Sequence, residues 1–130
     1  MSLNRNTAII LLLLLLLAGS YQPGPATIGV DRVTYVYEKD EGAVPPPIQY
    51  ALGELNKLKI VATAFEIDST TGLDSVPAQD RIAVEAAKKP EAGLPCLVVQ
   101  AGDKVTTIIK SPTTVKQIAD AVGVEIKEPS

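Results

Sequence analysis

The sequence has no histidine, no tryptophan, one cysteine and one phenylalanine among its 130 residues. Without histidine the chain lacks the most common general base, the Ser-His and Cys-His nucleophile pairs, and every histidine-based metal site. The single cysteine, Cys96, cannot form a disulfide within the chain. Because aromatic residues are so few, the core must be built from Val, Ile, Leu and Ala.

Concentrated positive charge is also absent. The chain carries 12 basic and 15 acidic residues, a formal net charge of −3, and its lysines and arginines do not cluster in any short stretch. A nucleic-acid surface needs clustered positive charge to displace counterions, so we expect no nucleic-acid partner. We also expect no cofactor and no metal. The charged residues 38–41 form no ligand cluster, and the loop from Asp68 to Asp74 lacks the spacing of a calcium site.

The long apolar run lies near the start of the chain. Arg5 precedes an uninterrupted apolar segment at residues 8–18, and two small residues follow it. A segment of this length suits the apolar part of a signal peptide, whereas a membrane-spanning helix needs about 20 residues. We therefore predict that residues 1–20 are a signal peptide or an N-terminal membrane anchor, and that the Pro- and Gly-rich residues 21–29 are a linker. The protein is expected to be exported, periplasmic or extracellular, with membrane contact only through residues 1–20 if they are retained.

Hydrophobic spacing and turn signals predict seven elements between residues 30 and 124. Runs of β-branched residues predict strands, and apolar residues three and four positions apart predict helices. In chain order we expect a strand at 33–37, a helix at 47–58, a strand at 60–67, a helix at 77–89, strands at 96–100 and 105–109, and a helix capped by Ser111 and ended by Gly123. The strand at 60–67 is almost wholly apolar, which is typical of a strand covered on both faces. Residues 125–130 are expected to be a flexible tail.

This order of elements predicts the fold class. A strand, helix and strand connected by a right-handed crossover give two parallel strands. The turn Ala101–Lys104 then predicts a hairpin, which adds two antiparallel strands. The result is an α/β three-layer sandwich, in which a mixed four-stranded sheet carries helices on both faces.

The stretch Gly93-Leu94-Pro95-Cys96 resembles a motif of the thioredoxin family. In that family a Gly-x-Pro, with the proline in the cis form, precedes a small residue and an apolar strand. It stands after the second helix and before a hairpin and a last helix, as it does here. The resemblance covers residues 30–124 and implies a thioredoxin-like fold with a cis Pro95.

The same resemblance implies that dithiol chemistry is missing. The family carries Cys-x-x-Cys between the first strand and the first helix, where this chain has Glu41-Gly42-Ala43-Val44. Two thiols are needed to attack and then resolve a mixed disulfide, so the chain lacks the redox centre. In the family the face formed by this loop and the Pro95 loop receives extended polypeptide segments, which implies a partner-binding face here at Glu41–Pro47 and at the Pro95 loop. The loop Asp68–Ser75 is longer than its counterpart in the family and could extend this face. The candidate partner-binding residues are Glu41, Gly42, Ala43, Val44, Leu94, Pro95 and Cys96.

Three functions are compatible with these features. The preferred interpretation is an exported thioredoxin-like domain without dithiol redox activity, which acts as a protein-binding or scaffold module. An alternative is a monothiol thiol-exchange enzyme that uses Cys96, although a buried Cys96 would be a small, inert core residue. A second alternative is a structural subunit of an envelope or membrane-attached assembly.

Overall fold

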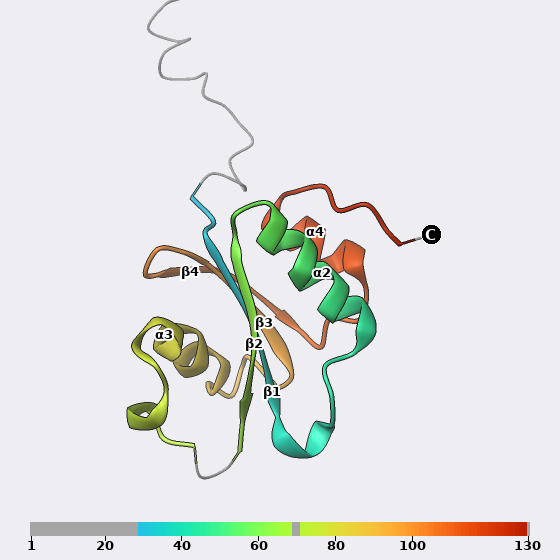
Figure 1. Ribbon diagram of the computed structural model, residues 1–130. Coiled ribbons are helices and arrows are strands. Elements are labelled where there is room, and N and C mark those ends of the chain that lie inside the picture. The colour runs from blue at the N-terminus through green and yellow to red at the C-terminus, as the bar shows by residue number, and fades with distance from the viewer. Residues whose placement is uncertain (1–28, 69–70, 130) are drawn as a thin grey trace, which may run out of the picture.

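The computed structural model describes residues 29–68 and 71–129. Within these residues, four strands and three α-helices follow one another as the sequence predicts (Figure 1). They are β1 (Arg32–Glu38), α2 (Pro46–Lys57), β2 (Val61–Ile67), α3 (Ala78–Ala87), β3 (Cys96–Ala101), β4 (Lys104–Lys110) and α4 (Val115–Val122), with 3-10 turns η3 (Lys39–Glu41) and η4 (Leu73–Ser75). The predicted signal peptide or anchor, and residues 21–28 of the predicted linker, lie outside the described residues.

The sheet is mixed, with the strand order β2-β1-β3-β4. β1 pairs parallel to β2 and antiparallel to β3, and β3 pairs antiparallel to β4. In this register Val36 of β1 lies opposite Cys96 of β3. The first two strands are therefore joined by a crossover through α2, and the last two form the predicted hairpin.

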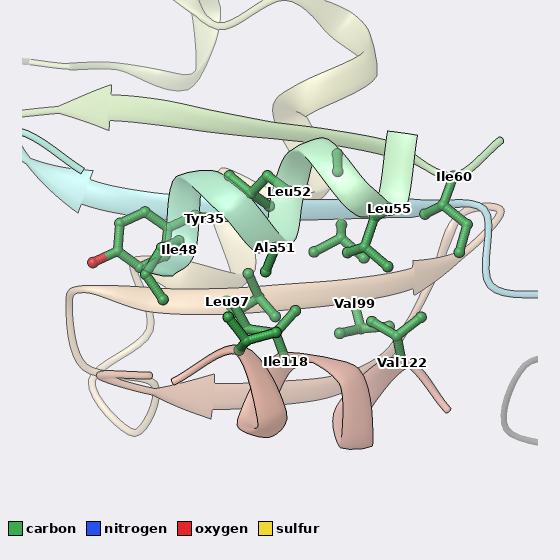
Figure 2. Packing of buried hydrophobic residues seen from close by; sticks show 13 residues of the cluster. Tyr35, Ile48, Ala51, Leu52, Leu55, Ile60, Leu97, Val99, Ile118 and Val122 are labelled. Atoms are coloured by element: carbon green, nitrogen blue, oxygen red, sulfur yellow. The ribbon is translucent and has the colours of Figure 1, made fainter. Parts of the chain in front are cut away.

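Helices cover both faces of the sheet, which makes the molecule a three-layer α/β sandwich (Figure 1). On one face, α2 and α4 pack side chains against Leu97 and Val99 of β3 (Figure 2). On the other face, α3 packs over Val36, Cys96 and Val98. The two faces of β3 thus belong to two separate apolar clusters, as the alternation of side chains along a strand requires.

The position of β2 differs from the prediction. The apolar run at 60–67 is an edge strand that is not covered on both faces, and the structure leaves Val61 43% exposed. Ala62 and Ile67 are the buried residues of this strand. The physical reason is that α3 packs chiefly over β1 and β3, so the first half of β2 has no helix above it on that face.

The start of α4 also differs from the prediction. Ser111 does not cap the helix; Thr114 does, because its Oγ1 accepts a hydrogen bond from the Gln117 backbone N–H at 3.1 Å. The Gln117 side chain in turn accepts one from the Thr114 N–H at 3.0 Å, which completes a capping box. Ser111 has a positive φ of 48°, and its N–H donates to the carbonyl of Pro95 at 2.8 Å. Gly123 ends the helix in the left-handed conformation, as predicted.

The segment after α4 lies against the helical layer, where the sequence predicts a flexible tail. Val124 and Ile126 pack on the cluster shared by α2 and α4. The hydroxyl of Tyr50 in α2 donates a hydrogen bond to the carbonyl of Lys127 at 2.6 Å. Among the described helices, none has both the length and the apolar character needed to cross a bilayer.

Candidate functional site

The sheet register brings the β1–α2 loop and the Pro95 loop to one edge of the molecule. Because Val36 pairs with Cys96 in antiparallel fashion, the chain leaves β1 beside the point where it enters β3. Residues 38–44 therefore emerge next to residues 93–95. We call these two segments together the Pro95 edge.

The backbone of the Pro95 loop has two unusual features, a cis peptide bond and a glycine with a positive φ. The Leu94–Pro95 peptide bond is cis, the isomer that the family resemblance implies. Gly93 has a φ of +74°, and a Cβ added there would lie 3.0 Å from Cε of Lys110. Glycine adopts this conformation without strain, and any other residue would also require the exposed Lys110 side chain to shift. Leu94 and Pro95 themselves are half-buried, so each presents part of its side chain to solvent.

The β1–α2 loop is ordered by its own hydrogen bonds. The carboxylate of Glu41 accepts from the backbone N–H of Glu38 at 2.6 Å and closes the short turn η3. Gly42 follows with a φ of +86°, and Ala43 is exposed. Val44 is half-buried, and its carbonyl accepts from the Gln49 side chain at 2.7 Å. The acidic residues thus form a turn of their own ahead of α2, whose first turn contains no acidic residue.

Cys96 is not part of the surface at this edge. Its side chain is 0% exposed and lies in the apolar cluster beneath α3. Burial raises the pKa of the Cys96 thiol from the ordinary value of 9.0 to about 11. A thiol with this pKa is almost wholly protonated at neutral pH, and the thiolate is the nucleophilic form. The structure therefore separates Cys96 from the other six candidate residues and gives it the features of a packing residue.

A cleft connects the Pro95 edge to the end of β2. It has a volume of about 360 Å³, and its lining includes Glu38, Asp68, Lys88, Lys89 and Leu94. A neighbouring hollow of about 510 Å³ shares Glu38 and Asp68 and adds Lys39 and Asp40. Lys88 Nζ also donates to the carbonyl of Thr71, which ties the start of the Asp68–Ser75 loop to the end of α3. The cleft thus brings Leu94 of the Pro95 loop together with Asp68 and with Glu38, the last residue of β1. The candidate residues Glu41, Gly42, Ala43 and Val44 line neither the cleft nor the neighbouring hollow.

A second concavity was not predicted from the sequence. This groove, of about 480 Å³, lies between the first turns of α2 and α4 and the C-terminal segment. Its lining is Pro46, Pro47, Tyr50, Thr113, Thr114, Val115, Glu128 and Pro129. Sequence reasoning missed it because the last residues were expected to form a free tail. The sequence did contain a signal for this groove: Val124 and Ile126 are apolar residues two positions apart. Their side chains pack on the helical layer and fix the C-terminal segment, which forms one wall of the groove.

The residues that line the cleft are of types suited to binding a polypeptide. In residues 29–68 and 71–129, no group of three or more His, Cys, Asp or Glu side chains could hold a metal ion. The cleft offers carboxylates, lysine ammonium groups and apolar edges, with no activated nucleophile beside them. Such a surface can recognise a polypeptide through charge and apolar contact.

Comparisons of the chain with protein-family models, with curated proteins and with solved structures return no match. The described part of the chain shows the α/β class, with a mixed four-stranded sheet and three α-helices. The finer family assignment rests on the Gly93–Cys96 motif and on the order of the elements.

Proposed function

We propose that this chain contains a thioredoxin-like domain without dithiol chemistry, which works by binding another protein at the Pro95 edge. The element order, the sheet order β2-β1-β3-β4 and the cis bond before β3 support the family assignment. The absence of cysteine from residues 41–44 supports the loss of redox activity, because exchange through a dithiol needs both sulfurs.

The observation that carries the proposal is a cleft at which the Pro95 loop meets the ends of β1 and β2. Glu38, the last residue of β1, Asp68, which follows β2, and Leu94 of the Pro95 loop all line it. Loops held on a rigid sheet are where binding residues concentrate. The acidic and lysine side chains around the cleft suit a polypeptide segment that carries charges of both signs beside apolar residues.

The monothiol alternative is disfavoured by the position of Cys96. An exchange enzyme needs a sulfur that a second thiol or disulfide can reach, and Cys96 is fully buried with a raised pKa. Export of the protein belongs to the same proposal and rests on residues 1–20, which lie outside the described residues. The assembly-subunit alternative stays a prediction of the sequence.

Site-specific photo-cross-linking tests the proposal. A benzophenone amino acid replaces Ala43, which is exposed on the Pro95 edge, or Glu85, which is exposed on α3 and serves as the matched control. In cells of the source organism we expect a discrete higher-mass adduct from position 43 and none from position 85. Equal adducts at both positions, or none at position 43, would contradict binding at this edge.

A further inference from the structure

The outer edge of β2 is open over part of its length. β2 is the last strand of the sheet on its side. In Figure 1 it stands in front of the other strands, with α2 and α4 to one side and α3 to the other. A strand at a sheet edge presents backbone N–H and C=O groups that can pair with another chain.

The two ends of this edge are already occupied by local hydrogen bonds. Val61 donates its N–H to the Asp31 carbonyl on the β1 side, so the backbone groups of Ala62, Ala64 and Glu66 point outward. Both groups of Ala62 are bound by the Asn56 side chain: its Oδ1 accepts from the Ala62 N–H at 2.9 Å, and its Nδ2 donates to the Ala62 carbonyl at 3.0 Å. The Asn56 amide therefore takes the place of a neighbouring strand at this residue.

The other end is closed in the same way. The Asp68 N–H donates to Thr71 Oγ1 at 2.9 Å, and the Thr71 N–H donates to the Asp68 carbonyl at 3.1 Å. Between the two closed positions, Ala64 and Glu66 keep their outward backbone groups unbonded within the described part of the chain. These two residues offer two N–H donors and two carbonyl acceptors, placed symmetrically about Phe65.

We propose that this open segment pairs with the same segment of a second copy of the chain, antiparallel and centred on Phe65. In that register Ala64 lies opposite Glu66 of the second copy, and each pair exchanges both of its hydrogen bonds. A centre at Ala64 would require Ala62, which Asn56 occupies, and a centre at Glu66 would require Asp68, which Thr71 occupies. Only the centre at Phe65 uses all four free groups and none of the occupied ones.

The side chains of β2 favour the same arrangement. The two Phe65 rings would face each other in a non-hydrogen-bonded pair, where cross-strand side chains lie closest. The charged Glu66 would face a small Ala64, so no like charges lie directly opposite. From Val61 to Phe65 the strand contains no lysine and no proline, the residues that usually protect an edge.

The opposite edge of the sheet lacks these features. β4 carries Lys104 and Lys110 at its two ends, and its pairing with β3 shifts in register between Val99 and Gln100. Terminal lysines and an irregular register are the usual protections against edge pairing. The proposal therefore concerns β2 alone, and it does not depend on the binding function proposed for the Pro95 edge.

Disulfide trapping tests the register. Phe65→Cys and Thr63→Cys are each made in the full chain carrying Cys96→Ser, in detergent with micelles in large excess over protein. The two Cα atoms at position 65 would lie about 4.5 Å apart, within disulfide reach, whereas those at position 63 would lie about 14 Å apart. We expect mild oxidation to link the Phe65→Cys chain into a dimer at a yield about tenfold above that of Thr63→Cys. Equal yields, no dimer, or links from position 65 only to other proteins would overturn the proposal.

A charge pair at Ala64 provides a test that does not disturb the core, because this side chain is exposed. Ala64→Glu would place two carboxylates opposite each other at both symmetric positions, whereas Ala64→Lys would place an ammonium opposite Glu66. In the Phe65→Cys chain we expect Ala64→Glu to lower the cross-linked fraction several-fold and Ala64→Lys to keep or raise it. An equal effect of both substitutions would show that the edge does not pair in this register. Circular dichroism of each variant verifies that the fold is retained.

Discussion

At the scale of single residues, burial decides what Cys96 can do. The same strand alternation that turns Leu97 toward α2 and α4 turns Cys96 toward α3, into an apolar cluster. Desolvation there disfavours the thiolate. Cys96 therefore follows Pro95 in the sequence but offers no reactive thiol at the surface of the Pro95 edge.

The raised pKa of Cys96 predicts a pH dependence of stability. The folded-state pKa, about 11, lies above the ordinary value of 9.0, so the unfolded chain loses this proton first as the pH rises. The contribution of Cys96 is complete below pH 9 and is lost between pH 9 and 11, by about 2 kcal/mol. Urea denaturation should show this decline in the wild type. In Cys96→Ala, which is less stable at pH 7 but has no thiol, the decline should be smaller by that amount.

Two glycines test the backbone at residue scale. Gly93→Ala should lower the free energy of unfolding by about 1–2 kcal/mol, because its φ of +74° is strained for any residue with a Cβ. Gly53→Ala should raise it by about 0.5–1 kcal/mol, because Gly53 lies within α2 and an added Cβ would meet nothing within 4 Å. Changes of the same sign would show that the Pro95 loop is not held as described.

At the scale of elements, the existence and type of each helix and strand could be read from the sequence, but some ends could not. Ser111-Pro112 is a common helix start, and Thr114 with Gln117 is another. The sequence did not reveal that the backbone N–H of Ser111 donates a hydrogen bond to the carbonyl of Pro95. This long-range hydrogen bond shifts the start of α4 by one turn.

The cap of α4 predicts a difference between two conservative changes. Thr114→Ala removes the acceptor of the Gln117 N–H and should cost about 1 kcal/mol of unfolding free energy. Ser111→Ala removes no described side-chain hydrogen bond and should change it by less than about 0.5 kcal/mol. Chemical denaturation of both variants measures the two values, and the reverse order would favour Ser111 as the cap.

At the scale of the whole molecule, the sheet and its layers follow from the sequence because connection rules leave few choices. A βαβ unit followed by a hairpin and a helix gives a mixed sheet with helices on two faces. The edge position of β2 could not be predicted from the sequence, because an apolar run is compatible with both a central strand and an edge strand. Of the seven candidate residues predicted from the sequence, the cleft at the Pro95 edge is lined by Leu94 alone. The groove beside Tyr50 was not predicted, because it depends on the contact with Lys127.

The central proposal also concerns the whole molecule: the protein acts by binding at the Pro95 edge without thiol chemistry. The most direct measurement is the yield of the photo-adduct formed from position 43, compared between chains with and without Cys96→Ser. We predict the same adduct, at the same yield, in both chains. Loss of the adduct in a Cys96→Ser chain that remains folded would contradict the account, because it would mean that the buried sulfur takes part in partner capture.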